Sequence, residues 1–567
     1  MADTKTENKT EPKPANGKFN LSYTERIIFS PHFRSMQDKT QLFFPSQKRR
    51  VRTRLTHTME VKTIAHDIGK RLNNKITNHL KDYPDSNLPL VNLDLVDAIA
   101  QAHDIGHTSF GHVGERTIDE VVSGKDDLGG VLRQPPVTPM RFKHNCNGMR
   151  ILVDMGIDDW RVVEGTLAHT RIFYKKDTTQ YATNPYQPFA NAAYNKMANF
   201  IFSESELDIH AEEKKNPPSL TLEGQIVAMS DEIAQRAADL GDAKLPARYL
   251  DNIEKLLTPY LHGRDIPKSY EDDPFLRLEW LVYNTMIHDV VDTSFKNYCD
   301  HCSKATQKTS GQSTSTVTNK PKPPKGIRHT ILTEKVVAFS NEKPEDSKKP
   351  KNNKKPSGKA SKKNPPMNMT EINDELAAFI FNYSAQSEDV RESDSRAKHI
   401  IRQLYKAFLS DVSLLPDAFL ERYLIGISNT PALKEAYDFF VTVANAPDES
   451  KDESKDESKD ESKAKEKEKA KANSKILENI QKQQLHVYSK VTQHHKQKIL
   501  NIGLAKDFFD ILNENNIERA KNPQKSTGND AISQLFDAFL LEVGFYIASL
   551  TNTEAFDIYN KVYGHTL

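Results

Sequence analysis

Residues 99–115, IAQAHDIGHTSFGHVGE, constrain the fold of this chain more than any other stretch. Apolar residues recur before His103 at the three- and four-residue intervals of a helical stripe, so a helix is expected to point His103 toward the core. A lone histidine on such a stripe is usually a hydrogen-bonded core residue. Here Asp104 follows it directly, and two more histidines and a glutamate follow within the same segment. This density of ionisable groups indicates a site that binds or cleaves a ligand.

The spacing within the segment predicts two pairs of side chains. His107 lies one helical turn after His103, and Glu115 lies three residues after His112. Members of each pair are expected to share a helix face. A His-Asp doublet followed by a second histidine pair is typical of a metal ion with a general acid or base beside it.

The letters HDIG also occur at residues 66–69, where they predict something different. His66 falls off the apolar stripe of its helix, so we interpret this copy as a solvated face. His57 lies four residues before Val61 and shares its stripe, so it is expected to point inward. Arg54, three residues before His57, is expected on the same side, where a guanidinium can bind phosphate oxygens.

Four motifs in order resemble the deoxyguanosine triphosphate triphosphohydrolase branch of the HD-domain phosphohydrolases. They are SPHFRSMQDKTQLFF at 30–44, RTRLTHTMEV at 52–61, AHDIGHTSFGHVGE at 102–115 and EGQIVAMSDEIAQRAADLGDA at 223–243. The resemblance covers most of the first half of the chain. It returns more faintly in later helical blocks, including FYIASLTNTEAFDIYNKVY near the end.

Four residues are expected to converge from three helices on one divalent cation: His57, His103, Asp104 and Asp231. Asp231 flanks an apolar stripe on a helix expected within residues 222–240, as a ligand from a distant helix would. Mixed imidazole and carboxylate ligation suits manganese, iron, nickel, magnesium or zinc to differing degrees, and the residues are compatible with each.

The resemblance implies roles for the other residues. His112 and Glu115 would form a catalytic dyad in which Glu115 orients His112, and His107 would contact the phosphate together with Arg54. The implied reaction attacks the α-phosphorus of a deoxynucleoside triphosphate and releases deoxynucleoside and inorganic triphosphate. Assembly into a homo-oligomer is implied as well.

The same resemblance places the sugar. Gln41 and Asp239 match positions that would bind its 3′-hydroxyl. Gln235 stands where the family often has Tyr, so the resemblance implies that it lines the sugar site, and we expect a preference for deoxyribose. Which base is preferred is not predicted.

Strand signals are nearly absent, and the apolar segments are long and spaced for helices, so we predict an all-α, multi-helix HD-domain bundle with disordered insertions. The predicted organisation is a disordered tail (1–19), an HD catalytic core (20–302), a low-complexity insertion (303–370) with an ordered island (326–341), a helical part of the same domain (371–446), a charged KDES-repeat linker (447–475) and a C-terminal helical part (476–567).

Composition excludes several classes of protein. The formal net charge of +1 argues against a surface built entirely for nucleic acid. Three cysteines fit a reducing compartment rather than a disulfide framework. No run of eighteen apolar residues occurs, and the polar start has no signal-peptide core. We therefore expect a soluble, cytoplasmic protein without a membrane partner.

Two alternatives stay open. An HD-type nucleotide phosphodiesterase or monophosphatase would use the same four metal ligands. The Lys-rich tract at 348–355 would suit a nucleic-acid-binding protein with an HD core, or an enzyme regulated by nucleic acid.

Overall fold

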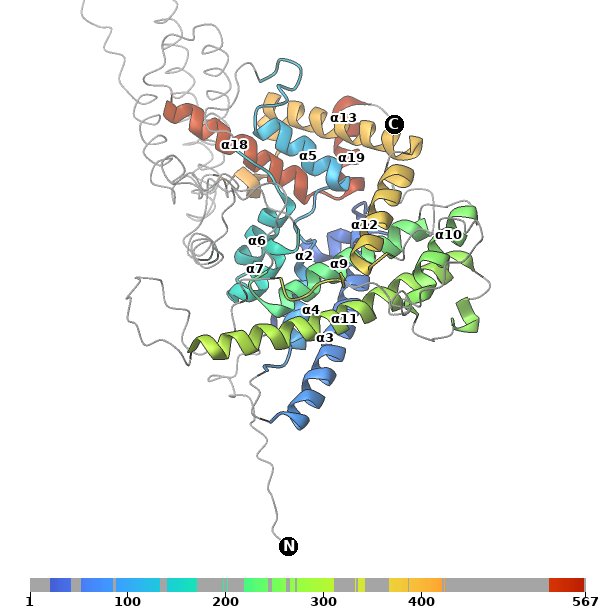
Figure 1. Ribbon diagram of the computed structural model, residues 1–567. Helices are drawn as coiled ribbons and strands as arrows, with labels where there is room; N and C mark the ends of the chain where they lie inside the picture. The colour runs from blue at the N-terminus through green and yellow to red at the C-terminus, as the bar shows by residue number, and fades with distance from the viewer. Residues whose placement is uncertain are drawn as a thin grey trace, which may run out of the picture.

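The computed structural model (Figure 1) describes part of the chain in detail. The described residues are 21–41, 52–84, 88–132, 140–170, 197, 201, 219–242, 247–261, 266–270, 273–309, 332, 335–341, 367–385, 387–420, 423 and 530–564.

The predicted all-α class is confirmed for these residues. They contain no strand, and the only β-type pairing among them is an isolated bridge between Thr40 and Thr53. The α-helices are α1 (Tyr23–Ile28), α2 (Pro31–Ser35), α3 (Arg54–Asp82), α4 (Leu93–Ala102), α5 (Gly111–Val122), α6 (His144–Asp154), α7 (Trp160–Ala168), α9 (Leu222–Asp242), α10 (Ala247–Leu257), α11 (Pro274–Thr309), α12 (Met369–Ile380), α13 (Glu388–Ser410), α18 (Asp530–Ser549) and α19 (Asn552–Tyr563).

Helix α3 is the central scaffold of the site. Thr53 caps its N-terminus in a capping box with Thr56, which satisfies backbone N–H groups that a first helical turn leaves without partners. One face carries a buried apolar stripe that includes Val61, Ile64 and Ile68. This stripe packs α3 against α4, α9 and α11, the helices that surround it in Figure 1.

Two hydrophobic clusters divide the described residues. The first joins α1, α2, α3, α4, α6, α7, α9, α10, α11 and α12. The second joins α5, α13, α18 and α19, which lie together at the top of Figure 1. The chain passes from the first cluster to the second through residues 103–110, called the motif loop below. Residues on either side of this loop are therefore held by different cores.

The predicted insertion is only partly described. In its ordered island, Val336 and Val337 are buried in the first cluster, and their backbone N–H groups both donate to Gln225 Oε1. Helix α12 begins at Met369 with Asn368 as its cap, just inside the predicted insertion boundary. The N-terminal tail and the KDES repeat lie outside the described residues, so the domain boundaries stay predictions.

None of the described helices alone has the length and apolar character needed to cross a membrane. Residues Leu535–Ser549 and Asn552–Tyr563 pass such a test only when taken together, and they are bent by 116°. All three cysteines are free thiols.

Candidate metal centre and active site

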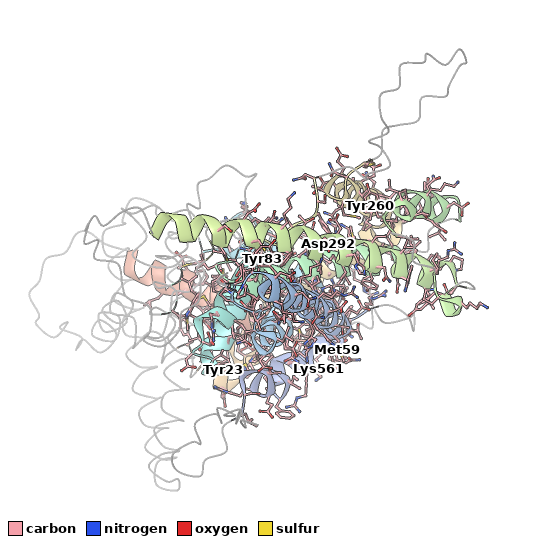
Figure 2. All side chains as sticks on the ribbon, turned by 60° about the horizontal axis from the view of Figure 1, so that its bottom comes forward. Tyr23, Met59, Tyr83, Tyr260, Asp292 and Lys561 are labelled. Atoms are coloured by element: carbon pink, nitrogen blue, oxygen red, sulfur yellow. The ribbon has the colours of Figure 1, made fainter. Side chains whose placement is uncertain are left out.

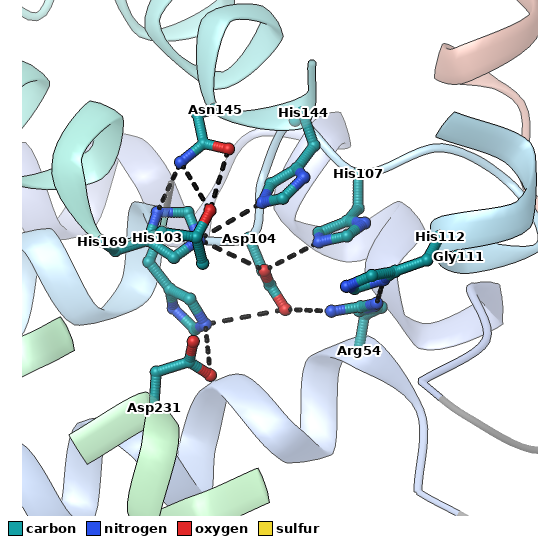
Figure 3. A network of polar contacts seen from close by, with 12 residues as sticks. Arg54, His103, Asp104, His107, Gly111, His112, His144, Asn145, His169 and Asp231 are labelled. Carbon is teal, nitrogen blue, oxygen red and sulfur yellow. Dashed lines mark hydrogen bonds and ion pairs between the residues drawn. The ribbon is translucent and has the colours of Figure 1, made fainter. Parts of the chain in front are cut away.

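Helices α3, α4 and α9 bring the four predicted metal ligands into one buried cluster. Figure 3 labels His103, Asp104 and Asp231 of this set. His57 Nε2 lies 2.9 Å from Asp231 Oδ1 and 4.0 Å from Asp104 Oδ2. His103 Nε2 lies 3.6 Å from Asp104 Oδ2 and 3.9 Å from Asp231 Oδ1. Donor atoms of His57, His103 and Asp231 all lie within 4.8 Å of one another, close enough to share one cation.

The chemistry of this donor set fits a cation. His103 Nδ1 donates to the Ala100 carbonyl at 2.7 Å, which leaves a lone pair on Nε2 of the neutral ring. That Nε2 is buried and has no hydrogen-bond partner among the described residues, although two carboxylates face it. Burial raises the pKa of Asp104, but Arg54, His103 and His107 outweigh burial and hold it well below its usual range. Asp104 is therefore an anion available to a metal ion.

The helix before the motif is shorter than predicted. Helix α4 ends at Ala102, His103 is its C-cap residue, and the chain then turns. At Gly106 a Cβ atom would lie 2.1 Å from the carbonyl oxygen of His144, so α6 packs directly on the loop backbone. The predicted one-turn helical relation of His103 and His107 is therefore wrong. His107 still joins the cluster, with Nε2 3.2 Å from Asp104 Oδ1.

Arg54 links the cluster to His112. Its guanidinium is 1% exposed and donates from Nη1 to Asp104 Oδ2 at 2.8 Å and from Nε to the Thr40 carbonyl at 3.0 Å. Nη2 lies 3.1 Å from His112 Nδ1. An arginine cannot accept a hydrogen bond, so His112 Nδ1 accepts and the neutral ring carries its proton on Nε2.

The His112 ring is packed among protein atoms on one side and is exposed to solvent on the other. The residue is exposed, yet the protein packed around its ring, followed by the Arg54 charge, lowers its pKa. The ring is therefore neutral at pH 7, with its Nε2–H available on the open side of the cluster.

Glu115 contacts a different histidine from the one predicted. Its carboxylate lies 2.5 Å from Lys143 Nζ, accepts the His144 backbone N–H at 3.0 Å and makes a short contact with His144 Nδ1. The start of α6 lies against this face of α5, whereas His112 turns toward Arg54. The charge of Glu115 still acts on His112, whose pKa it raises against the larger lowering by burial and Arg54. The catalytic dyad of His112 and Glu115 therefore stays a prediction.

His144 and His169 complete the cluster but were absent from the predicted site. The His144 ring stacks on His107 at a centroid distance of 3.8 Å, and His144 Nε2 lies 3.3 Å from His169 Nε2. His169 Nε2 lies 3.9 Å from Asp104 Oδ1. Both residues are polar positions within buried stretches of α6 and the end of α7, which is the only signal the sequence offered.

The predicted sugar-binding residues differ in what they contact. Gln235 Nε2 donates to both oxygens of Asp231, at 3.0 and 3.1 Å, so it supports a predicted metal ligand instead of facing an open pocket. Gln41 Oε1 is shielded from solvent and has no hydrogen-bond partner among the described residues. Asp239 follows Asp231 on α9 by two turns, or about 12 Å at 1.5 Å per residue.

Comparisons with known proteins agree with this geometry. Residues 54–235 match the HD domain, and residues 365–430 match a phosphohydrolase-associated domain. A deoxyguanosinetriphosphate triphosphohydrolase-like protein of Neorickettsia sennetsu is 25% identical over 75% of this chain and 87% of its own length. Proteins of the same description from Clostridium tetani and Rickettsia bellii are 29% and 27% identical.

The last two matches span about half of each relative, 48% and 58%, and cover 43% and 47% of this chain. The matched HD region contains all four predicted metal ligands. The chain therefore carries an HD domain, and its similarity to these relatives supports a place in the deoxyguanosinetriphosphate triphosphohydrolase-like family.

Proposed function

We propose that this protein hydrolyses a deoxynucleoside triphosphate, dGTP or several dNTPs, at the α-phosphorus and releases deoxynucleoside and inorganic triphosphate. The observation that carries the proposal is the convergence of His57, His103 and Asp231 on one point, with Arg54 and His112 beside it. The relatives described as deoxyguanosinetriphosphate triphosphohydrolase-like suggest the substrate class.

His57, His103, Asp104 and Asp231 would hold one divalent cation, manganese, magnesium or another transition metal. A cation held there supplies positive charge for phosphate oxygens and promotes deprotonation of the attacking water. The Gln235 amide holds the Asp231 carboxylate by both oxygens, so it keeps that carboxylate in one orientation.

Arg54 and His107 would bind the α-phosphate. A guanidinium has five N–H groups, and Arg54 uses three of them on Thr40, Asp104 and His112. Two N–H groups remain for phosphate oxygens. The contact with Asp104 holds the guanidinium beside the predicted metal ligands, so its charge lies where negative charge develops on the phosphoryl group.

His112 would handle the proton of the attacking water or of the leaving 5′-oxygen. Its Nδ1 is occupied by Arg54, so Nε2 is the atom that exchanges a proton with substrate. Glu115 would act through His144, because its carboxylate contacts that ring and Lys143. The negative charge of Glu115 then lies next to the stacked rings of His107 and His144 and stabilises positive charge on them.

The sugar would lie along α9. Gln41 and Asp239 are the proposed partners of the 3′-hydroxyl, and a preference for deoxyribose is retained. The Gln235 amide donates to Asp231, so Gln235 would line the wall of the sugar site without bonding the sugar through that amide. The substrate is the proposed partner, assembly into a homo-oligomer is proposed from the family, and nucleic acid is retained as a proposed regulator.

The reaction products test the proposal. Purified protein is incubated with each dNTP and a manganese or magnesium salt, and the products are resolved by ion-exchange chromatography. Deoxynucleoside and inorganic triphosphate are expected in equal amounts, and both should disappear in His112→Ala. The matched control is His79→Ala, a half-buried histidine at the far end of α3 that should keep activity.

Other products identify the alternatives. Deoxynucleoside monophosphate and pyrophosphate as primary products would overturn the proposed release of intact triphosphate. Stepwise release of orthophosphate would indicate a phosphatase. Absence of turnover with every nucleotide would favour the nucleic-acid-binding alternative, which a salt-dependent mobility-shift assay then measures.

A further inference from the structure

A groove of about 800 Å³ lies on the outer face of α3, away from the metal centre. Helices α1, α2 and α4 form its other walls, and Met59, labelled in Figure 2, lies on its α3 side. Its volume is within the range of sites that bind small molecules. Thr58 follows the predicted ligand His57 directly but lines the groove, so one helix serves both places.

The second HDIG copy contributes its first two residues to this groove. His66 and Asp67 line it, and His66 Nδ1 lies 3.0 Å from Asp97 Oδ1 on α4. Gly69 faces α4 so closely that a Cβ atom there would lie 2.9 Å from Leu93 Cδ2. In this copy of the motif, His66 and Asp67 therefore line the groove, and Gly69 allows α3 to pack closely on α4.

Two buried polar side chains of the lining have atoms without a hydrogen bond. Thr58 is fully buried and Gln101 is 3% exposed. Thr58 Oγ1 and Gln101 Oε1 have no hydrogen-bond partner among the described residues. Buried polar atoms in folded proteins are almost always paired, and an exception points to a missing ligand or water. A hydroxyl and an amide together offer both donors and acceptors to a polar edge.

The charges of the groove favour an anion. Asp97 is paired with Lys62 at 3.3 Å as well as with His66, and Asp67 is paired with Arg71 at 2.8 Å. Lys70 is exposed and forms no ion pair with a described residue. Both carboxylates are thus neutralised by the protein, whereas the Lys70 charge is not.

The remaining wall is apolar. Ile28 of α1, Phe33 of α2 and Met59 of α3 line it. Met59 is 60% exposed, so its side chain is accessible to a molecule in the groove. A ligand that filled the groove would place an apolar body against these three residues.

We propose that this groove is a second ligand site, for a small amphipathic anion. Its apolar or aromatic body packs on Ile28, Phe33 and Met59, a polar edge bonds Thr58 and Gln101, and a phosphate or carboxylate group lies at Lys70. The site shares α3 and α4 with the metal centre but uses none of its residues.

The test uses the Met59 methyl group as a local reporter. Full-length protein labelled with ¹³C-methyl methionine is titrated with phenyl phosphate, 3-phenylpropionate and inorganic phosphate, and the Met59 resonance is assigned by Met59→Leu. At least one aromatic anion should shift this resonance with saturation and bind at least tenfold more tightly than inorganic phosphate. The stronger of the two aromatic probes identifies phosphate or carboxylate as the preferred group.

Variants decide whether the groove binds as described. Lys70→Met and Gln101→Met should each weaken binding of the preferred probe at least fivefold, while Lys75→Met, farther along α3 and outside the groove, should not. Far-UV circular dichroism and melting temperature verify that the variants fold. A Met59 resonance that does not move, equal binding of inorganic phosphate, or unchanged binding in Lys70→Met would overturn the proposal. The readout needs no turnover, so it is independent of the proposed enzymatic reaction.

Discussion

Lys39 offers a quantitative test of how the motif loop is held. The residue is 3% exposed, and its Nζ donates to the carbonyl oxygens of His107 at 2.6 Å and Ala548 at 2.9 Å. It therefore ties the motif loop to α18, and its partner Ala548 lies 509 residues after Lys39 in sequence. Burial lowers the pKa of Lys39 to about 7, with a further lowering by Arg54 and an opposing effect of Glu554.

This pKa predicts how stability depends on pH. A lysine in an unfolded chain has a pKa of about 10.4, so between pH 7 and that value the unfolded chain holds a proton that folded Lys39 has lost. The contribution of Lys39 to the free energy of unfolding is therefore fully present above the unfolded pKa and is lost as pH falls to 7. At about 1.4 kcal/mol per unit, the change between pH 7.5 and 9.5 is about 2 to 3 kcal/mol. A neutral amine keeps two N–H donors, so both hydrogen bonds survive deprotonation.

The assay compares wild-type protein with Lys39→Met, which cannot titrate. Urea unfolding is measured for both at pH 7.5 and 9.5, and groups shared by the two proteins cancel in the difference. The stability of wild type relative to Lys39→Met should rise by about 2 to 3 kcal/mol over this interval. The surface variant Lys75→Met, whose lysine pairs with Asp292 in an exposed position, should show no such rise. Parallel pH profiles for wild type and Lys39→Met would refute the reasoning.

Four further outcomes are expected. His103→Ala should lose bound manganese by elemental analysis while its helical circular dichroism persists, and His66→Ala should keep the metal; stoichiometric metal in His103→Ala would contradict the ligand assignment. Gly106→Ala forces a Cβ against the backbone of α6 and should lower stability by about 1 to 3 kcal/mol, and an unchanged melting temperature would count against this packing. Deleting 342–366 should leave the melting temperature unchanged, whereas extending the deletion through Asn368 removes the cap of α12 and should cost about 1 kcal/mol. Catalytic efficiency should be higher with dGTP than with GTP, and equal values would disprove the sugar preference.

The sequence predicted the ligand cluster because each ligand lies on a local apolar stripe or beside one. His57 and Val61 share a buried face of α3, and His103 ends the buried stripe of α4. Helical periodicity depends only on residues close in sequence, so it can be recognised without the tertiary structure. The end of α4 could not be predicted in this way, because it depends on the approach of α6 to Gly106.

The partner of Glu115 shows a second limit. Spacing on α5 places His112 within reach of Glu115, but His144 of α6 lies on the same carboxylate and takes the contact. Whether His112 or His144 lies closer to Glu115 depends on how α5 and α6 pack, and the spacing of residues in the sequence does not predict that packing. Gln235 shows the same limit, since its expected role came from the family resemblance and its contact is with Asp231 four residues earlier.

The position of His112 relative to the metal ligands depends on residues that the motif does not contain. Phe110 adopts a left-handed backbone, φ 62°, which a residue with a side chain rarely occupies without support. Its N–H donates to Asn552 Oδ1 at 2.8 Å, and Asn552 Nδ2 donates to Thr40 Oγ1 at 2.6 Å. Thr40 in turn accepts Arg54 Nε through its carbonyl. The motif loop thus leaves the first hydrophobic cluster at His103 and enters the second at Phe110, which Asn552 of α19 anchors. The C-terminal helices are therefore part of the scaffold that sets the distance between the metal ligands and His112.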